Sequence, residues 1–138
     1  MKLSAIKTDL AKAEQGVWID NIPDMGELRL KVRPVGNPDY RRVYGQLVDA
    51  TPRHLKRGGI ISDQQTKSDI SARTLADTVL LDWDGLEGED GKPLKYDPVL
   101  AKQLLLNPEY GALRDAVAWA GNVASEETTG TAEANAGN

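Results

Sequence analysis

The segment Ala72–Val123, which reads ARTLADTVLLDWDGLEGEDGKPLKYDPVLAKQLLLNPEYGALRDAVAWAGNV, contains most of the strongly periodic apolar residues of this chain. Its first part carries small and apolar side chains at the spacing of one helical face. These residues are Ala72, Leu75, Ala76, Val79 and Trp83. We therefore predict a helix that continues to Trp83. Glycines follow at positions 85, 88 and 91, and the pair Asp90-Gly91 predicts a tight turn.

Two shorter helices are predicted after this turn, because an Asx residue precedes a proline at Asp97-Pro98 and again at Asn107-Pro108. The Asx side chain caps a free backbone N–H, and proline has no N–H to lose at the first helical position. The first helix has one apolar side, made of Leu100, Ala101, Leu104 and Leu105. The second has two adjacent apolar stripes, made of Tyr110, Leu113, Val117, Ala120 and of Ala112, Ala116, Trp119, Val123. A helix that is apolar over this width is covered on more than one side, by a core or by a partner.

The chain before this segment predicts a β-hairpin and then a helix. Residues 16–22 are a strand candidate, and residues 27–35 alternate between apolar and charged side chains as a half-buried strand does. Asn37-Pro38 then begins a helix that Thr51-Pro52 ends. Its buried stripe is predicted to be Tyr40, Val43, Tyr44 and Leu47. The capping-box spacing that begins at Ser62 starts the polar first half of the helix that continues into Ala72.

These patterns predict an α+β fold that is mostly helical, with a small N-terminal β-hairpin packed on a helical core. We expect one domain over residues 1–124, with the hairpin in 15–36 and the helical part in 37–124. Both tryptophans of the long segment, Trp83 and Trp119, are expected in the core. Residues 125–138 have no large apolar side chain, so we predict that they form a disordered tail. The first 15 residues are compatible with a short amphipathic helix or with a frayed start.

Composition excludes several kinds of site. The chain has no cysteine, which excludes disulfides, thiolate metal sites and cysteine nucleophiles. No apolar run is long enough for a signal peptide or a membrane span, so we expect a cytosolic protein. Charge is unevenly distributed, because residues 1–57 carry 11 basic and 7 acidic groups whereas residues 58–138 carry 6 and 14. This division fits an ordinary solvated surface, or halves that meet different partners or each other between subunits.

No set of residues has the pattern of a catalytic, cofactor-binding or metal site. The single histidine, His54, lies in a basic loop, and no serine has the context of a nucleophile. The acidic residues from Asp82 onward do not form an EF-hand loop, since Leu86 and Pro93 occupy ligand positions. A basic set could contact nucleic acid phosphates, and its members are Arg41, Arg42, Arg53, His54, Lys56 and Arg57. A small nucleic-acid-associated regulatory protein is therefore the alternative hypothesis.

Several short motifs resemble those of the tail assembly chaperones of long-tailed bacteriophages and prophages. They are RPVGNPDYRR at 33–42, LLDW at 80–83, DGKP at 90–93, YDP at 96–98, LLL at 104–106 and the helix that contains Trp119. The resemblance covers roughly residues 15–123. It implies a non-enzymatic protein that binds the tape measure protein and helps to recruit tail tube subunits. It also implies action in the host cell cytoplasm and absence from the mature virion.

The surface expected to bind this partner is the apolar part of the last two helices. The apolar width of the second helix exceeds what the first can cover, and an apolar patch left on a monomer is usually a site for a partner or for self-association. The predicted contact residues are Leu100, Leu104, Leu105, Tyr110, Leu113, Val117 and Trp119. We also consider a homo-oligomer, and we expect no cofactor, metal or membrane partner.

Overall fold

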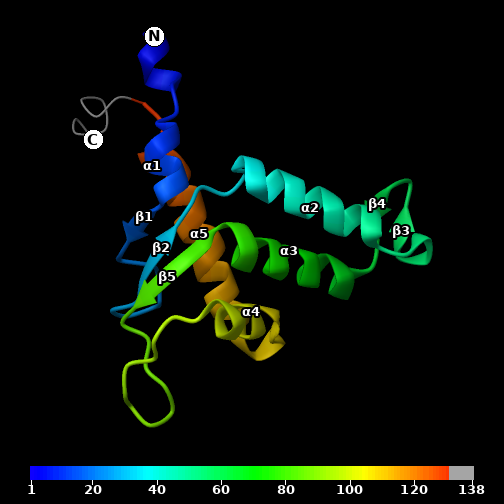
Figure 1. Cartoon of the computed structure of the whole chain (residues 1–138). Helices are drawn as coiled ribbons and strands as arrows, with labels where there is room; N and C mark the ends of the chain where they lie inside the picture. The colour runs from blue at the N-terminus through cyan, green and yellow to red at the C-terminus, as the bar shows by residue number, and fades with distance from the viewer. Residues whose placement is uncertain (131–138) are drawn as a thin grey trace.

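A three-stranded antiparallel sheet, in the order β1–β2–β5, joins the N-terminal part of the chain to its middle (Figure 1). The structure is a computed structural model that describes residues 1–130. Strands β1 (Val17–Ile19) and β2 (Arg29–Val32) form the predicted hairpin, with Val17 opposite Val32. Strand β5 (Leu80–Asp84) pairs with the other edge of β2. The predicted class, mostly helical α+β with an N-terminal hairpin, is confirmed.

Strand β5 corrects the prediction that one helix continues to Trp83. Helix α3 (Gln64–Thr78) ends at Thr78 with Val79 as its C-cap, and the next five residues are a strand in which Leu80 and Trp83 are both buried. A regular strand would place residues three apart on opposite faces. The register shifts between Lys31 and Val32, so Leu81 is an extra, unpaired residue in β5. Because of this bulge, Leu80 and Trp83 both point into the core. The bulge therefore gives this strand two buried residues three positions apart, which is also the spacing of one face of a helix.

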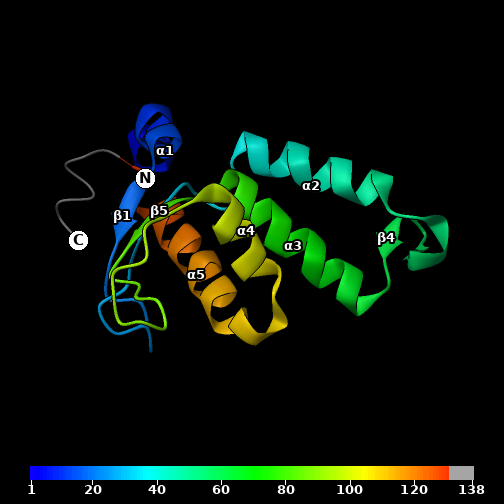
Figure 2. The ribbon, with the colours of Figure 1, turned by 60° about the horizontal axis from the view of Figure 1, so that its bottom comes forward.

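Helices α2 (Pro38–Ala50) and α3 lie side by side and extend away from the sheet as an arm (Figures 1 and 2). Asn37 caps α2 as predicted, whereas Asp63 rather than Ser62 caps α3. The predicted stripe on α2 is only half-buried, because α2 packs mainly against α3. At the tip, the short 3-10 helix η2 (Arg53–Leu55) leads into a two-stranded sheet of β3 (Lys56–Arg57) and β4 (Ile60–Ile61). The expected helical part 37–124 therefore also contains strands.

Helix α4 (Pro98–Leu106) and the 3-10 helix η3 (Pro108–Tyr110) begin at the predicted caps, Asp97 and Asn107. Helix α5 (Gly111–Glu127) packs along the sheet and buries most of the first predicted stripe but only Ala116 of the second. Its buried residues are Leu113, Ala116, Val117, Ala120, Gly121 and Ala124. Gly121 allows the close approach, since a Cβ there would lie 2.5 Å from Val35 Cγ2. The Val35 N–H donates to the Gly121 carbonyl at 3.2 Å.

The end of α5 corrects the prediction of a tail that begins at residue 125. The helix continues to Glu127, and Thr128 is buried beside the N-terminal residues. There, the Asp9 N–H donates to the Thr128 carbonyl at 2.7 Å, and the Gly130 N–H donates to the Lys7 carbonyl at 2.7 Å. Order at this point needs no large apolar residue, because a distant segment satisfies the backbone. The remainder of the predicted tail, residues 131–138, lies outside the described residues.

The N-terminal segment consists of the 3-10 helix η1 (Leu3–Ile6) and helix α1 (Leu10–Gln15), which Asp9 caps. The segment is therefore partly helical, which agrees with the expected short helix and not with a frayed start. Neither element buries any of its own residues.

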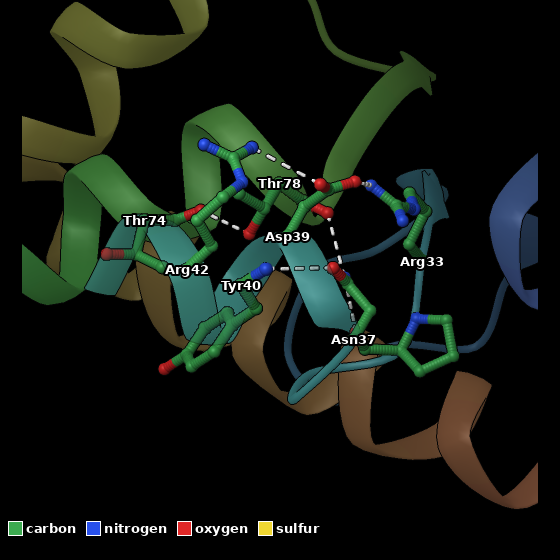
Figure 3. A network of polar contacts seen from close by, with 8 residues as sticks. Arg33, Asn37, Asp39, Tyr40, Arg42, Thr74 and Thr78 are labelled. Carbon is green, nitrogen blue, oxygen red and sulfur yellow. Dashed lines mark hydrogen bonds and ion pairs between the residues drawn. The ribbon is translucent and has the colours of Figure 1, made fainter. Parts of the chain in front are cut away.

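Asn37 connects three parts of the fold (Figure 3). Its Oδ1 accepts from the Tyr40 N–H at 2.9 Å, while its Nδ2 donates to the carbonyls of Pro34 at 2.8 Å and Thr78 at 3.0 Å. The side chain thereby caps α2 and holds that helix against the end of α3. Hydrogen bonds from Arg33 and then from Arg42 lower the pKa of the neighbouring Asp39, which stays ionised and pairs with both.

Replacing Asn37 tests this connection. Asn37→Ala should lower the free energy of unfolding by about 2–4 kcal/mol, since it removes a cap and the side-chain donor of the buried Thr78 carbonyl. The Pro34 carbonyl keeps the Asn37 backbone N–H at 3.3 Å. Asp97→Ala is the matched control because it removes only an exposed cap, and about 1 kcal/mol is expected there. Urea unfolding followed by circular dichroism measures both. Equal losses in the two variants would show that the bonds to Pro34 and Thr78 contribute nothing.

The tryptophans should differ in their effect on stability. Trp83 is buried, donates from Nε1 to the Leu94 carbonyl at 2.7 Å and meets the Tyr96 ring edge-on. Trp83→Ala should therefore cost about 3–5 kcal/mol. Trp119 is 38% exposed, which corrects its expected place in the core. Trp119→Ala should cost less than about 1.5 kcal/mol. Thermal unfolding measures both variants, and a Trp119→Ala chain that lost as much stability as Trp83→Ala would contradict the exposed position of Trp119.

Candidate partner-binding groove on helix α5

The predicted contact residues divide into an inaccessible and an accessible group. Leu105 and Val117 are 1% and 0% exposed and offer no surface to a partner in this fold, whereas Leu113 is 8% exposed and lies in the lining of the larger hollow described below. The reason is that α5 packs on the sheet and α4 with the side that carries Leu113 and Val117. Leu100 and Leu104 are half-buried, while Tyr110 and Trp119 are 42% and 38% exposed.

Three of the accessible residues, Leu104, Tyr110 and Trp119, border two adjoining hollows along α5, whereas Leu100 lines neither of them. One hollow, of about 310 Å³, lies between α5 and the turn of the β1–β2 hairpin, with Ile22, Met25 and Trp119 in its lining. The other, of about 450 Å³, lies between α5, η3 and the loop that follows β5. Its apolar lining includes Leu86, Leu94, Leu104 and Tyr110. Both hollows are lined by Met25 and Ala112, so they form one surface, which we call the α5 groove.

Two loops of the sheet line the side of the α5 groove opposite α4. Figure 2 brings the end of the molecule that carries these loops forward. The hairpin turn is closed by hydrogen bonds from the Met25 N–H to Ile22 and from the Leu28 N–H to Met25. The second loop is closed by the Leu94 N–H, which donates to the Leu86 carbonyl at 2.7 Å. The loops approach closely at Gly85, where φ is +84° and a Cβ would lie 2.6 Å from the Glu27 carbonyl oxygen. A side chain at position 85 would push this wall apart.

Carboxylates surround the apolar floor of the α5 groove. The acidic residues in its lining are Asp24, Glu87, Glu89, Glu109 and Asp115, and all are exposed. The one cation close to any of them in the ion pairs of the described residues is Arg114, whose Nε lies 3.8 Å from Asp115. An apolar floor with an acidic rim fits a polypeptide segment that carries apolar side chains flanked by basic ones.

Sequence reasoning identified the α5 side of this groove but missed its opposite wall. Met25, Leu86 and Leu94 lie in turns, where no periodic pattern marks an apolar residue as part of a surface. The only feature of the sequence that could have indicated this wall is the composition of the turns, since each places a single large apolar side chain between turn residues.

The basic set proposed for nucleic acid does not form one patch. Arg41 lies in the first turns of α2, whereas Arg53 and Arg57 lie beyond its far end. The length of α2 between Arg41 and its end at Ala50 is about 14 Å. Arg42 is also held by Asp39 at 3.2 Å. What the structure brings together is a smaller basic tip around η2 and β3, with exposed Ile60 beside it.

Within residues 1–130, no cluster of three or more histidine or acidic side chains could hold a metal ion. Over the same residues, no helix is both long and apolar enough to cross a membrane.

Fold and groove together define a mostly helical α+β protein with a solvent-accessible apolar groove beside its last helix. The model of the family described as YdaY prophage protein matches residues 35–138, which is more than half of the chain. The chain belongs to this family and is therefore a prophage protein. The matched region contains α5, α4 and the loop after β5, but not the hairpin turn that carries Met25. No curated protein and no solved structure gives a significant match.

Proposed function

We propose that this prophage protein is a tail assembly chaperone. In this role it binds the tape measure protein through the α5 groove and helps to recruit tail tube subunits during tail morphogenesis. The observation that carries the proposal is the groove itself, an accessible apolar surface that includes Leu104, Tyr110 and Trp119. Membership of a prophage family and the resemblance of the motifs at 33–42 and 80–98 support it.

The physical role of such a groove is to cover apolar surface on an unassembled partner. A long helical tape measure protein would expose apolar stripes before tube subunits surround it, and a helix laid in an apolar groove buries such a stripe. Burial of this kind is driven by removal of apolar area from water and is insensitive to salt. The proposed activity needs no catalytic group or cofactor, and it takes place in the host cell cytoplasm, with the chaperone absent from the mature virion.

The motifs that carry the resemblance mostly support the groove rather than line it. Asn37 caps α2 and ties it to α3, and Asp97 caps α4. Trp83 anchors the loop after β5 through the Leu94 carbonyl, and Gly91 lies in the turn of that loop. In this proposal these residues hold the walls of the groove, and the contacts to the partner come from less regular positions such as Met25 and Tyr110.

Co-expression with the tape measure protein of the same prophage tests the proposal. The unaltered chain should keep that partner soluble and co-purify with it at low and at high salt. Trp119→Glu should abolish both effects with little change in melting temperature, because the indole is part of the accessible groove. Val99→Glu is the matched control, since Val99 is 65% exposed on α4 but does not line the groove. A tape measure protein that is soluble alone and forms no complex would refute the chaperone function.

The alternative, a nucleic-acid-associated protein, predicts different results in the same preparation. Binding to duplex DNA would weaken steeply with added salt. It would be reduced by Arg53→Ser with Arg57→Ser and unaffected by Trp119→Glu. The division of the basic set between the two ends of α2 makes this the weaker hypothesis.

A further inference from the structure

The N-terminal arm, residues 2–10, carries apolar side chains that are not packed in the core of the protein. Leu3, Ile6 and Leu10 are 82%, 59% and 74% exposed. Backbone hydrogen bonds attach the arm to the end of α5, with Lys7 and Asp9 bonded to Gly130 and Thr128. Large apolar side chains gathered on one short segment indicate a surface that another chain covers.

The arm and the α5 groove have complementary chemistry. Lys2 and Lys7 flank the segment that carries Leu3 and Ile6 in the arm, whereas the groove offers an apolar floor and a rim of carboxylates. An arm of this composition would place apolar side chains on the floor and ammonium groups near the rim.

The arm cannot reach the centre of its own groove. The groove is centred on Ala112, near the start of α5, whereas the arm is attached beside Thr128. The α5 backbone between these residues spans about 24 Å. The four residues from Lys7 back to Leu3 span at most about 14 Å when fully extended. Figure 1 shows the arm at one end of α5 and the loop after β5 at the other.

We propose that the N-terminal arm of one copy occupies the α5 groove of a second copy. Donor and acceptor are different surfaces, so the contact is heterologous and leaves a free arm at one end and a free groove at the other. Copies would therefore add head to tail. The inference depends on the groove but not on the identity of the partner proposed above, which would displace the arm by competing for the same surface.

Sedimentation velocity of the purified full chain over a range of concentrations tests self-association without any partner present. The unaltered chain should form species larger than a dimer as its concentration rises. An arm variant, Leu3→Asp with Ile6→Asp, and a groove variant, Trp119→Glu, should each need at least about tenfold higher concentration for association. None of these three residues is buried, and Val99→Glu again serves as the control that should associate normally.

Mixing the two variants gives the sharpest result. The groove variant retains an intact arm and the arm variant retains an intact groove, so the mixture should form dimers that cannot grow further. A chain that stays monomeric at every concentration would overturn the inference, and so would an arm variant that associates normally. Loss of association on Ile60→Asp, with the arm variant unaffected, would assign the donor to the basic tip instead. Because these assays contain no tape measure protein, their failure leaves the chaperone proposal standing.

Discussion

The pairing of β5 with β2 is the interaction on which the rest of the structure depends. A two-stranded hairpin is marginal in water, and β5 supplies the third strand that makes the sheet stable enough to carry a core. Leu30 and Val32 on β2, together with Leu80 and Trp83 on β5, then form one apolar face. Helix α5 packs on the sheet and completes the core.

This pairing also determines where the other elements lie. The Arg33 N–H donates to the Val79 carbonyl, so the end of β2 meets the end of α3. Asn37 then bonds to the carbonyl of Thr78, the last residue of α3, and begins α2 in the direction that runs back along α3. At the other end of β5, Gly85 turns the chain beside Glu27 and starts the loop that forms one wall of the α5 groove. One strand pairing thus places both the helical arm and the groove.

The groove lies beside helix α5 because the core covers only one side of that helix. Its inner side is fully used by the core, and the residues just outside that side, Trp119 and Tyr110, are left where loops rather than regular elements cover them incompletely. Incomplete cover by loops leaves apolar surface accessible, and exposed acidic residues of the same loops border it. The exposed apolar residues of the N-terminal arm lie at the opposite end of the same helix. A single helix therefore separates a donor surface from an acceptor surface by more than the arm can span.

The sequence by itself determined those elements whose ends depend on interactions between neighbouring residues, such as helix caps and tight turns. The Asx-Pro pairs at 37, 97 and 107 began helices, the alternation in 27–35 made a strand, and Asp90-Gly91 lay in a turn, because each depends on a few neighbouring atoms. Tertiary structure decided the state of 80–84, where a bulge gives a strand the spacing of a helix. It also decided the order of 125–130, where distant backbone groups replace apolar burial. Finally, it decided that one α5 stripe is buried except at Tyr110 while the other keeps Ala112 and Trp119 exposed, since burial is set by what packs against a helix and not by the helix itself.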